Sequence, residues 1–317
     1  MMNIERVSTV GMSREDWLLS RRKSIGGSDA GTILGFNKYN SPYALWAEKT
    51  GKVIPEDISD KEAVRLGNDL EDYVARRFME ATGKKVRNCN AIIYNPDYPF
   101  AHANPDRLVV GENAGLECKT TSSWDILKRC EAGDFPETWY CQIVHYMMVT
   151  GAEKWYLAVL CFGHGFFWFE VKRKQSEIDA LAEAERDFWD NYVAQRVEPP
   201  LDGTDATADA ISTIYADSIP GQKTDLTAVS DAVHAYMAAN KQIKELEELQ
   251  DKAKATIETF MQDSEKGELS GIAKVTWAPQ SRVTFDYKAY EAECGKLPAQ
   301  YFKTSESRVF RLNKVKS

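Results

Sequence analysis

A predicted β-hairpin limits what this chain can fold into. The strand-forming run 107–110 is followed by the glycine-flanked run 111–115, which predicts a tight turn into a second strand. Asp106 stands at the start of the first strand, and Glu117 and Lys119 lie within the second. Because a hairpin folds back on itself, we expect Asp106 to lie level with Lys119.

The same hairpin brings two carboxylates and an ammonium together. Side chains alternate across a strand, so Glu117 and Lys119 share a face from which Cys118 points away. Hard carboxylate oxygens suit Mg²⁺ or Mn²⁺. A lysine beside such a metal can orient or deprotonate a water and offset charge on a phosphorane-like transition state. The residues therefore point to metal-dependent hydrolysis of a phosphate ester.

The acid-x-Lys pattern alone is weak, because Glu170-Val171-Lys172 and Asp286-Tyr287-Lys288 also fit it. A single triplet of this kind is more often a solvated surface charge pair than a functional site. Only the copy at Glu117 follows a Pro-Asp across a predicted hairpin, and this context makes it the preferred candidate.

Composition is that of an ordinary globular protein. The 317 residues are 43% hydrophobic and 28% charged, enough for one large domain or a smaller one with an appendage. No apolar run reaches the ~18 residues of a membrane span, and the N-terminus lacks a signal-peptide pattern. The cysteines are scattered, which favours buried thiols in a reducing cytoplasm over a disulfide frame or zinc site.

Charge is unevenly distributed along the chain. The net charge is −8, but residues 1–52 carry eight Lys/Arg against five Asp/Glu, and residues 303–317 carry five against one. The acidic excess lies between these segments and includes the predicted metal site. A local DNA-binding surface is compatible with this distribution.

The order of predicted elements indicates an α/β core with a central mixed sheet flanked by helices. A tight loop, 25–29, is expected to lead from the first helix into the next. The other elements follow from apolar periodicity and caps: helices at 13–23, 41–51, 60–82, 136–150 and 176–195, and strands at 91–94, 106–110, 115–120, 154–162 and 166–172.

A change in composition divides the chain after the core. Residues 1–198 form the predicted core, and the Pro-, Gly- and small-polar-rich run 199–225 predicts a linker. In the extension, 226–317, one face of a long helix is apolar and needs a partner helix in this chain or another copy. The tail predicts a small strand-rich unit, with strands at 272–277, 282–285 and 307–312.

Further residues support the metal-site interpretation. Glu71 lies in the helix predicted at 60–82, either as a solvated carboxylate or as a further metal ligand. Gln142 is either a core-polar glutamine or a hydrogen-bond partner of the attacking water or the DNA backbone. His145 fits a structural histidine better than a ligand.

Arg21 and Ser28 flank the glycine loop that precedes a predicted helix. An arginine fork, a hydroxyl and free backbone N–H groups make a suitable pocket for a terminal phosphate. Without the predicted hairpin, the run 21–23 would be interpreted as a solvated helix end favoured by the helix dipole.

Five ordered motifs resemble a known family: Trp17 through Ala30, Gly67 through Glu71, Pro105-Asp106, Glu117-Cys118-Lys119, and Gln142. Over residues 10–195 the chain resembles YqaJ-like viral recombinases, relatives of the lambda-type phage exonuclease in the PD-(D/E)xK nuclease superfamily. One departure from the lambda-type enzyme is Asn104, which stands where a serine precedes the Pro-Asp.

This resemblance implies a restriction-endonuclease-like core that digests one strand of duplex DNA from a 5′ end. It implies Mg²⁺, replaceable by Mn²⁺, with two ions per site. The implied roles are metal ligands at Asp106, Glu117 and Glu71 and at the backbone carbonyl of Cys118, water orientation or activation by Lys119, assistance by Gln142, and 5′-phosphate binding by Arg21 and Ser28.

The resemblance also implies linear double-stranded DNA as substrate, a single-strand annealing protein as partner, and a homo-oligomer such as a ring-shaped trimer. The expected location is the cytoplasm, that of the host if the protein is phage-encoded. Two alternatives stay open: a structure- or sequence-selective DNA endonuclease on the same core, and a non-catalytic DNA-end-binding assembly protein.

Overall fold

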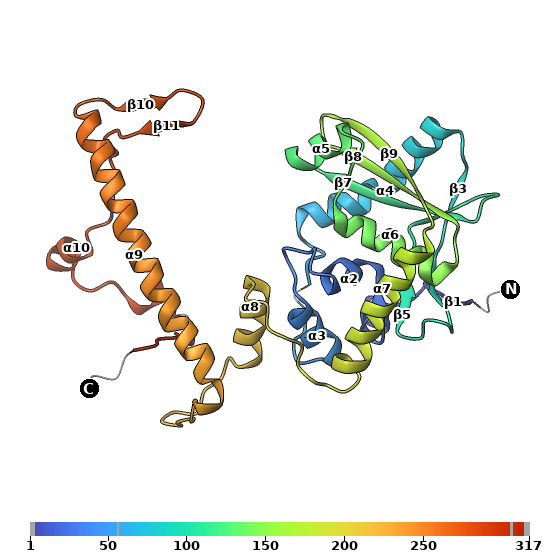
Figure 1. Cartoon of the computed structure of the whole chain (residues 1–317), viewed down its shortest axis with the longest axis horizontal. Coiled ribbons are helices and arrows are strands. Elements are labelled where there is room, and N and C mark those ends of the chain that lie inside the picture. Colours follow the sequence, from blue (N-terminus) through green and yellow to red (C-terminus); the bar gives the residue numbers. More distant parts are fainter. Residues whose placement is uncertain (1–3, 56, 305–306, 314–317) are drawn as a thin grey trace. The chain divides into compact units, whose positions relative to one another are not determined.

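The computed structural model describes residues 4–55, 57–304 and 307–313 (Figure 1). The chain forms two compact units, Met1–Tyr215 and Ala216–Ser317. Among the described residues, no helix is both long and apolar enough to cross a membrane.

The N-terminal unit contains two sheets, and the larger one carries the predicted hairpin. Its strand order is β3-β6-β7-β8-β9, and only the β7–β8 pair is parallel, so the sheet is mixed as predicted. The smaller sheet has the order β1-β4-β5-β2. The strands are β1 Glu5–Ser8, β2 Ile25–Gly26, β3 Val86–Asn88, β4 Ala91–Tyr94, β5 Ala101–Ala103, β6 Arg107–Val109, β7 Ala114–Thr121, β8 Lys154–Cys161 and β9 Gly165–Lys172.

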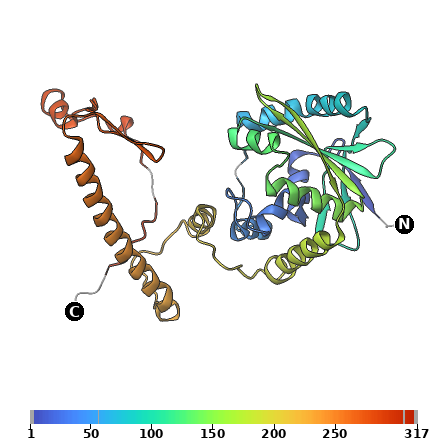
Figure 2. The same cartoon turned by 45° about the horizontal axis from the view of Figure 1, so that its top comes forward.

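Helices cover both faces of the larger sheet (Figures 1 and 2). On one face α4 packs on alternate residues of β7 and β8, among them Leu116 and Tyr156. The other residues of β8, such as Leu157, join the main core with α6 and α7. The helices are α1 Arg14–Arg22, α2 Gly27–Ile33, α3 Pro42–Thr50, α4 Glu62–Thr82, α5 Trp124–Glu131, α6 Glu137–Thr150, α7 Gln175–Asp187 with a π-helical turn Phe188–Val193, and α8 Asp205–Ile214.

The ends of α3 illustrate how sequence sets the boundaries of the predicted helices. The Ser41 hydroxyl accepts a hydrogen bond from the backbone N–H of Ala44, and Pro42 occupies the first turn. Gly51 ends the helix in the left-handed conformation, with φ of +75°, which glycine adopts without steric cost. The helix predicted at 41–51 is confirmed.

Two parts of the N-terminal unit differ from the predictions. The predicted loop 25–29 instead contains β2 and the start of α2, because β2 pairs in parallel with β5. The run predicted as a linker, 199–225, contains α8, whose buried Thr207 donates a hydrogen bond of 2.7 Å to Ser41. The linker prediction is therefore wrong over 205–214, because packing on α3 stabilises a helix there.

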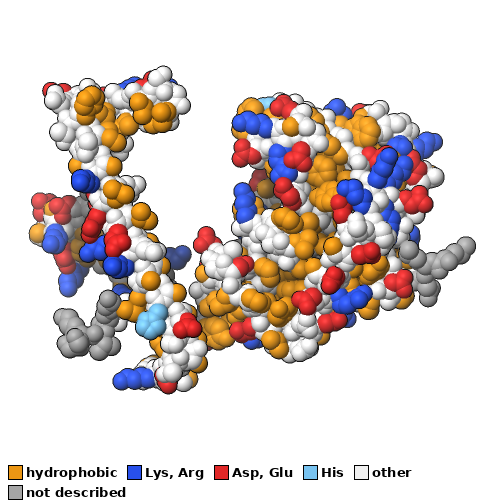
Figure 3. All heavy atoms as spheres, viewed as in Figure 1, with side chains coloured by type: hydrophobic (Ala, Val, Ile, Leu, Met, Phe, Trp, Pro, Cys, Tyr) orange, Lys and Arg blue, Asp and Glu red, His pale blue; other side chains and the backbone are white. Residues whose placement is uncertain are grey.

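The C-terminal unit is built on the helix α9, Ser230–Met261, which confirms the long helix. It is followed by the hairpin β10 Lys266–Leu269 and β11 Ala273–Thr276, and by α10 Tyr287–Cys294. The strands predicted at 282–285 and 307–312 are wrong, since neither described run pairs with another strand. Hydrophobic side chains stay exposed on α9 (Figure 3): Ile243, Leu246, Leu249, Ile257 and Phe260.

Candidate active site

Glu117 and Lys119 lie on the face of β7 that α6 covers. The Lys119 Nζ lies 2.6 Å from Glu117 Oε1, with the Glu117 side chain 3% exposed. Cys118 packs on the opposite face, against the α4 cluster. The alternation predicted for this strand is thus confirmed, and it places a carboxylate–ammonium pair inside the fold.

Gln142 joins this pair to α6. Its Oε1 accepts a hydrogen bond of 3.0 Å from Lys119 Nζ, and its Nε2 donates to Glu117 Oε1 at 2.8 Å. The same Nε2 donates to the Tyr146 hydroxyl at 2.9 Å, and that hydroxyl donates to the backbone carbonyl of Asn104. The amide is therefore fixed in one orientation by contacts on both sides.

Asp106 lies where the β6–β7 ladder ends. The last ladder pair is Arg107 opposite Leu116, and beyond it the Asp106 Oδ2 accepts a hydrogen bond of 2.8 Å from the Cys118 N–H. The N–H and C=O of one strand residue point to the same edge. The carbonyl of Cys118 is consequently directed toward the side where Asp106 lies, as its predicted role requires.

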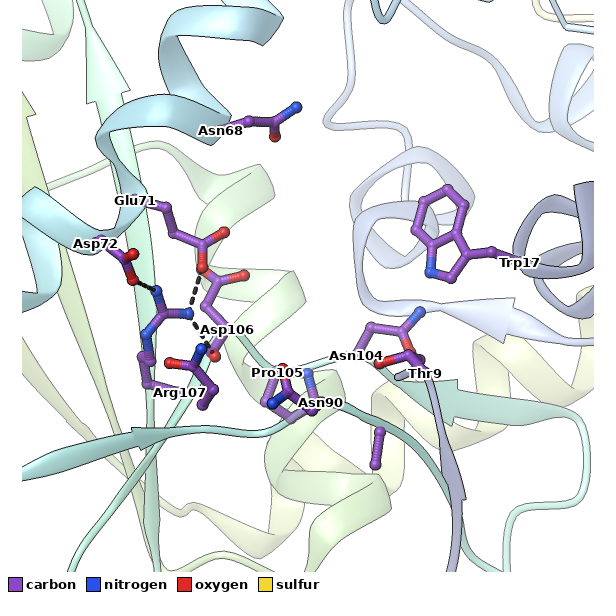
Figure 4. A pocket seen from close by; sticks show the side chains of 12 residues that line it. Thr9, Trp17, Asn68, Glu71, Asp72, Asn90, Asn104, Pro105, Asp106 and Arg107 are labelled. Atoms are coloured by element: carbon purple, nitrogen blue, oxygen red, sulfur yellow. Dashed lines mark hydrogen bonds and ion pairs between the residues drawn. The ribbon is translucent and has the colours of Figure 1, made fainter. Parts of the chain in front are cut away.

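Glu71 approaches from α4 and is held by an arginine. Its carboxylate pairs with Arg107 Nη1, while Arg107 Nη2 lies 2.5 Å from Asp72 Oδ1. Figure 4 shows the carboxylates of Glu71 and Asp106 pointing toward one another. Over the described parts of the chain, no three His, Cys, Asp or Glu side chains are placed to hold a metal ion. Glu71 lies near the site, but its carboxylate is paired with Arg107.

The electrostatics of the site reflect an excess of negative charge. Burial and the carboxylates of Glu117 and Glu71 raise the pKa of Asp106 well above its ordinary value. Burial opposes the charge on Lys119, but Glu117 and Asp106 nevertheless raise the pKa of its ammonium. Lys119 is therefore protonated at neutral pH and can act as a hydrogen-bond donor.

Two of the predicted ligands fit a divalent cation. Glu117 Oε2 is buried and has no hydrogen-bond partner among the described residues. The neighbouring carboxylates oppose ionisation of Asp106, and a bound cation would relieve this repulsion. Hard carboxylate oxygens of this kind are ligands that Mg²⁺ and Mn²⁺ prefer. Glu71 would have to leave Arg107 to join them.

Arg21 and Ser28 meet as predicted. Arg21 Nη2 donates a hydrogen bond of 2.8 Å to the Ser28 hydroxyl, and the guanidinium lies 4.8 Å from the centre of the Trp17 ring. Gly27 connects this pair to the carboxylate site, because a Cβ there would lie 2.6 Å from Tyr146 and 3.1 Å from the Gln142 Cγ. Only glycine lets α2 approach α6 so closely.

A polar cavity of about 350 Å³ adjoins the site (Figure 4). Its lining includes Glu71, Asp106 and Arg107. Around these charges it is rich in amides, with Asn68, Asn88, Asn90 and Asn104 on the wall. A lining of this composition suits a polar, hydrogen-bonding ligand such as a nucleic acid backbone.

Sequence reasoning missed Arg107 and Tyr146. Arg107 binds Glu71 across 36 positions of sequence, and no local pattern predicts that contact. Tyr146 had an available signal, because it lies four residues after Gln142 and so shares its face of a helix. His145 is structural as expected, with Nδ1 2.7 Å from Glu185 and Nε2 2.8 Å from the His102 carbonyl.

The two other acid-x-Lys triplets have structural roles. Glu170 on β9 lies 4.0 Å from Lys154 on the neighbouring strand β8. Asp286 caps α10, since its Oδ1 accepts a hydrogen bond of 2.9 Å from the Ala289 N–H. Both fit the surface interpretation.

Comparison with known proteins identifies the family. Residues 16–153 match the model of the YqaJ-like viral recombinase domain. Over 303 residues the chain is 40% identical to the protein YqaJ of Bacillus subtilis (strain 168), covering 95% of this chain and 93% of the relative. The chain belongs to the YqaJ-like viral recombinase family. The matched YqaJ-like segment, 16–153, contains every predicted site residue from Arg21 to Gln142.

Solved structures similar to this YqaJ-like chain include exonucleases. An alkaline exonuclease from Laribacter hongkongensis has a TM-score of 0.48 and 17% identity, covering 58% of this chain and 94% of that one. A phage related exonuclease from Haemophilus somnus 129PT has a TM-score of 0.37 and 12% identity, covering 55% of this chain and 96% of that one. The family assignment rests on the sequence matches alone.

Proposed function

We propose that this protein is a Mg²⁺-dependent exonuclease that digests one strand of linear double-stranded DNA from its 5′ end. One observation carries the proposal. Gln142 contacts Lys119 and Glu117 on one side and packs against Gly27, beside Ser28, on the other. A hydrolytic cluster and a phosphate-type pocket therefore lie one side chain apart, as removal of nucleotides from a phosphorylated end requires.

The side chains have distinct roles in this proposal. Lys119, being protonated, donates a hydrogen bond to the attacking water or the scissile phosphate and offsets its charge. Gln142 fixes the positions of Lys119 and Glu117 through its amide oxygen and its amide nitrogen, respectively. Asp106 and Glu117, with the Cys118 carbonyl, would hold the divalent ion, and Glu71 would hold a second after leaving Arg107. Bound there, the ion would supply Lewis-acid stabilisation of developing phosphate charge.

The terminal phosphate is assigned to Arg21 and Ser28. A guanidinium and a hydroxyl 2.8 Å apart can both donate to one phosphate group. The Ser28 side chain is exposed, so the pocket is accessible from solvent. We also propose that this protein is cytoplasmic and forms a homo-oligomer, such as a trimeric ring. It would work with a single-strand annealing protein in recombination.

The function is tested with three substrates: 5′-phosphorylated linear duplex, the same duplex with 5′-hydroxyl ends, and a closed circle. We expect Mg²⁺-dependent release of nucleotides, fastest from the phosphorylated linear substrate and absent from the circle. Rapid cutting of the closed circle would refute the exonuclease in favour of an endonuclease.

A variant tests the site assignment. Lys119→Ala should lose turnover by at least about two orders of magnitude while still binding duplex, because its charge acts on the transition state. Binding without any hydrolysis by the unaltered protein would instead favour the DNA-end-binding assembly protein. A fully active Lys119→Ala would place the hydrolytic centre elsewhere.

A further inference from the structure

Lys49 of α3 contacts the segment that joins Arg21, at the end of α1, to Ser28, at the start of α2. Its side chain is 6% exposed, and its Nζ lies 2.6 Å from Asp29 Oδ2. The same nitrogen donates to the backbone carbonyl of Arg21 at 2.8 Å and to that of Ser24 at 2.9 Å. All three ammonium donors are thus used inside the protein.

These contacts fix the spacing between Arg21 and Ser28. Arg21 is in the last turn of α1, and Ser28 is in the first turn of α2. Lys49 binds the α1 end through the Arg21 carbonyl and the α2 start through Asp29. Asp29 also accepts a hydrogen bond of 2.9 Å from the Gly26 N–H, which ties down the turn between the helices.

Lys49 also determines the charge that a bound phosphate would experience. Asp29 directly follows Ser28, and although burial alone would raise its pKa, Lys49 and Arg21 hold the pKa of this carboxyl at about 2. The carboxylate is therefore ionised at neutral pH beside a site proposed for an anion. Without Lys49, Asp29 would lose its ion-pair partner, and its negative charge would be offset less and would repel a phosphate dianion.

We propose that Lys49 is a positioning residue for recognition of the DNA 5′-phosphate. It holds Arg21 and Ser28 at the separation needed to contact one phosphate, and it neutralises Asp29 beneath them. Nothing in the local sequence marks Lys49 for this role, because the end of α1 and the start of α2 that it joins lie 28 and 20 positions away. The inference rests on the proposed assignment of Arg21 and Ser28 to the terminal phosphate.

Two variants break the same ion pair with opposite consequences. Lys49→Met removes the ion-pair partner of Asp29, so the preference for phosphorylated over hydroxyl ends should fall at least tenfold. Asp29→Asn removes the negative charge but keeps a side-chain oxygen that can accept from Lys49 and from the Gly26 N–H, so the spacing of Arg21 and Ser28 is retained while the pocket becomes more positive. Its preference should stay at least equal to that of the unaltered protein.

The measurement is equilibrium binding of labelled duplexes with 5′-phosphate or 5′-hydroxyl ends to the full chain, in Ca²⁺ so that binding is read without cleavage. Lys52→Met is the matched control, since Lys52 lies just after α3 and its ammonium contacts the surface residue Glu198, at 3.5 Å, and the Trp46 ring, at 4.6 Å from its centre. This variant should keep the end preference. Circular dichroism verifies that each variant is folded.

A folded Lys49→Met with unchanged end preference would overturn the inference, and so would an Asp29→Asn that loses the preference. If Lys49→Met does not fold, Asp29→Asn alone decides. An unaltered protein that binds both ends equally also overturns it, whatever its nuclease activity. Conversely, a protein that prefers phosphorylated ends but hydrolyses no DNA contradicts the proposed function and leaves the role of Lys49 supported.

Discussion

Lys119, to which we assign a role in hydrolysis, should also stabilise the fold. Its partner Glu117 is 3% exposed, so Lys119→Met would leave a buried carboxylate without its cation. Breaking a buried pair in this way costs about 3–5 kcal/mol. The lower end applies here, because Gln142 still donates to Glu117.

A loss of about 3 kcal/mol corresponds to a fall in Tm of roughly 6–12 °C for a unit of this size. The assay is thermal unfolding followed by circular dichroism in EDTA and then in Mg²⁺. A cation that binds only the folded state stabilises it. Because the site of Lys119→Met lacks the lysine cation and is more negative, we expect Mg²⁺ to raise the Tm of this variant more than that of the unaltered protein.

The double variant Glu117→Gln/Lys119→Met is the matched control. It removes both charges at nearly constant volume, so it should recover most of the lost Tm while staying inactive. If Lys119→Met melts in EDTA within about 2 °C of the unaltered protein, or if the double variant melts no higher than the single one, the electrostatic account of the site is wrong.

Three further predictions concern stability and domain structure. The pKa of Asp29 is about 2 instead of 3.8, so its pairing should add about 2 kcal/mol to the free energy of unfolding above pH 4. This contribution is lost as the pH falls toward 2, and the unfolding free energies of Asp29→Asn and of the unaltered protein should converge by that amount over this range. Gly27→Val should lower nuclease activity and destabilise the fold by about 1–3 kcal/mol, because the new side chain would clash with Tyr146. DNA hydrolysis and urea unfolding measure the two effects, and a variant with both quantities unchanged would contradict the packing. A chain ending at Tyr215 should fold and keep its nuclease activity, whereas one ending before α8 should melt at lower temperature because Ser41 and the α3 surface become exposed.

Local patterns predicted the hairpin and the face shared by Glu117 and Lys119, because alternation and a glycine turn act over a few residues. The pairing of Glu71 with Arg107 was not predictable, since α4 and β6 meet only through tertiary packing. The family resemblance implies that Glu71 is a metal ligand, yet the folded chain gives that carboxylate an arginine partner.

Sequence patterns misled in the predicted linker and in the tail. Pro199-Pro200 and the small polar residues after them are typical of a connector, but Thr204 caps α8 and Ala210 is buried. In the tail, the run 307–312 contains Val309 and Phe310, residue types that favour strands. Phe310 instead packs edge-on against Tyr236 of α9, with ring centroids 5.3 Å apart. A strand pattern predicts a strand only where a partner strand is available.

The bond from the Cys118 N–H to Asp106 has a practical consequence for choosing an inactive form of the protein. Asp106→Ala would remove an acceptor and leave a strand amide without a partner, so lost activity could reflect a damaged hairpin. Asp106→Asn keeps an oxygen in place to receive that N–H while removing the charge. The asparagine form is therefore the better substrate trap for capturing DNA on an intact scaffold.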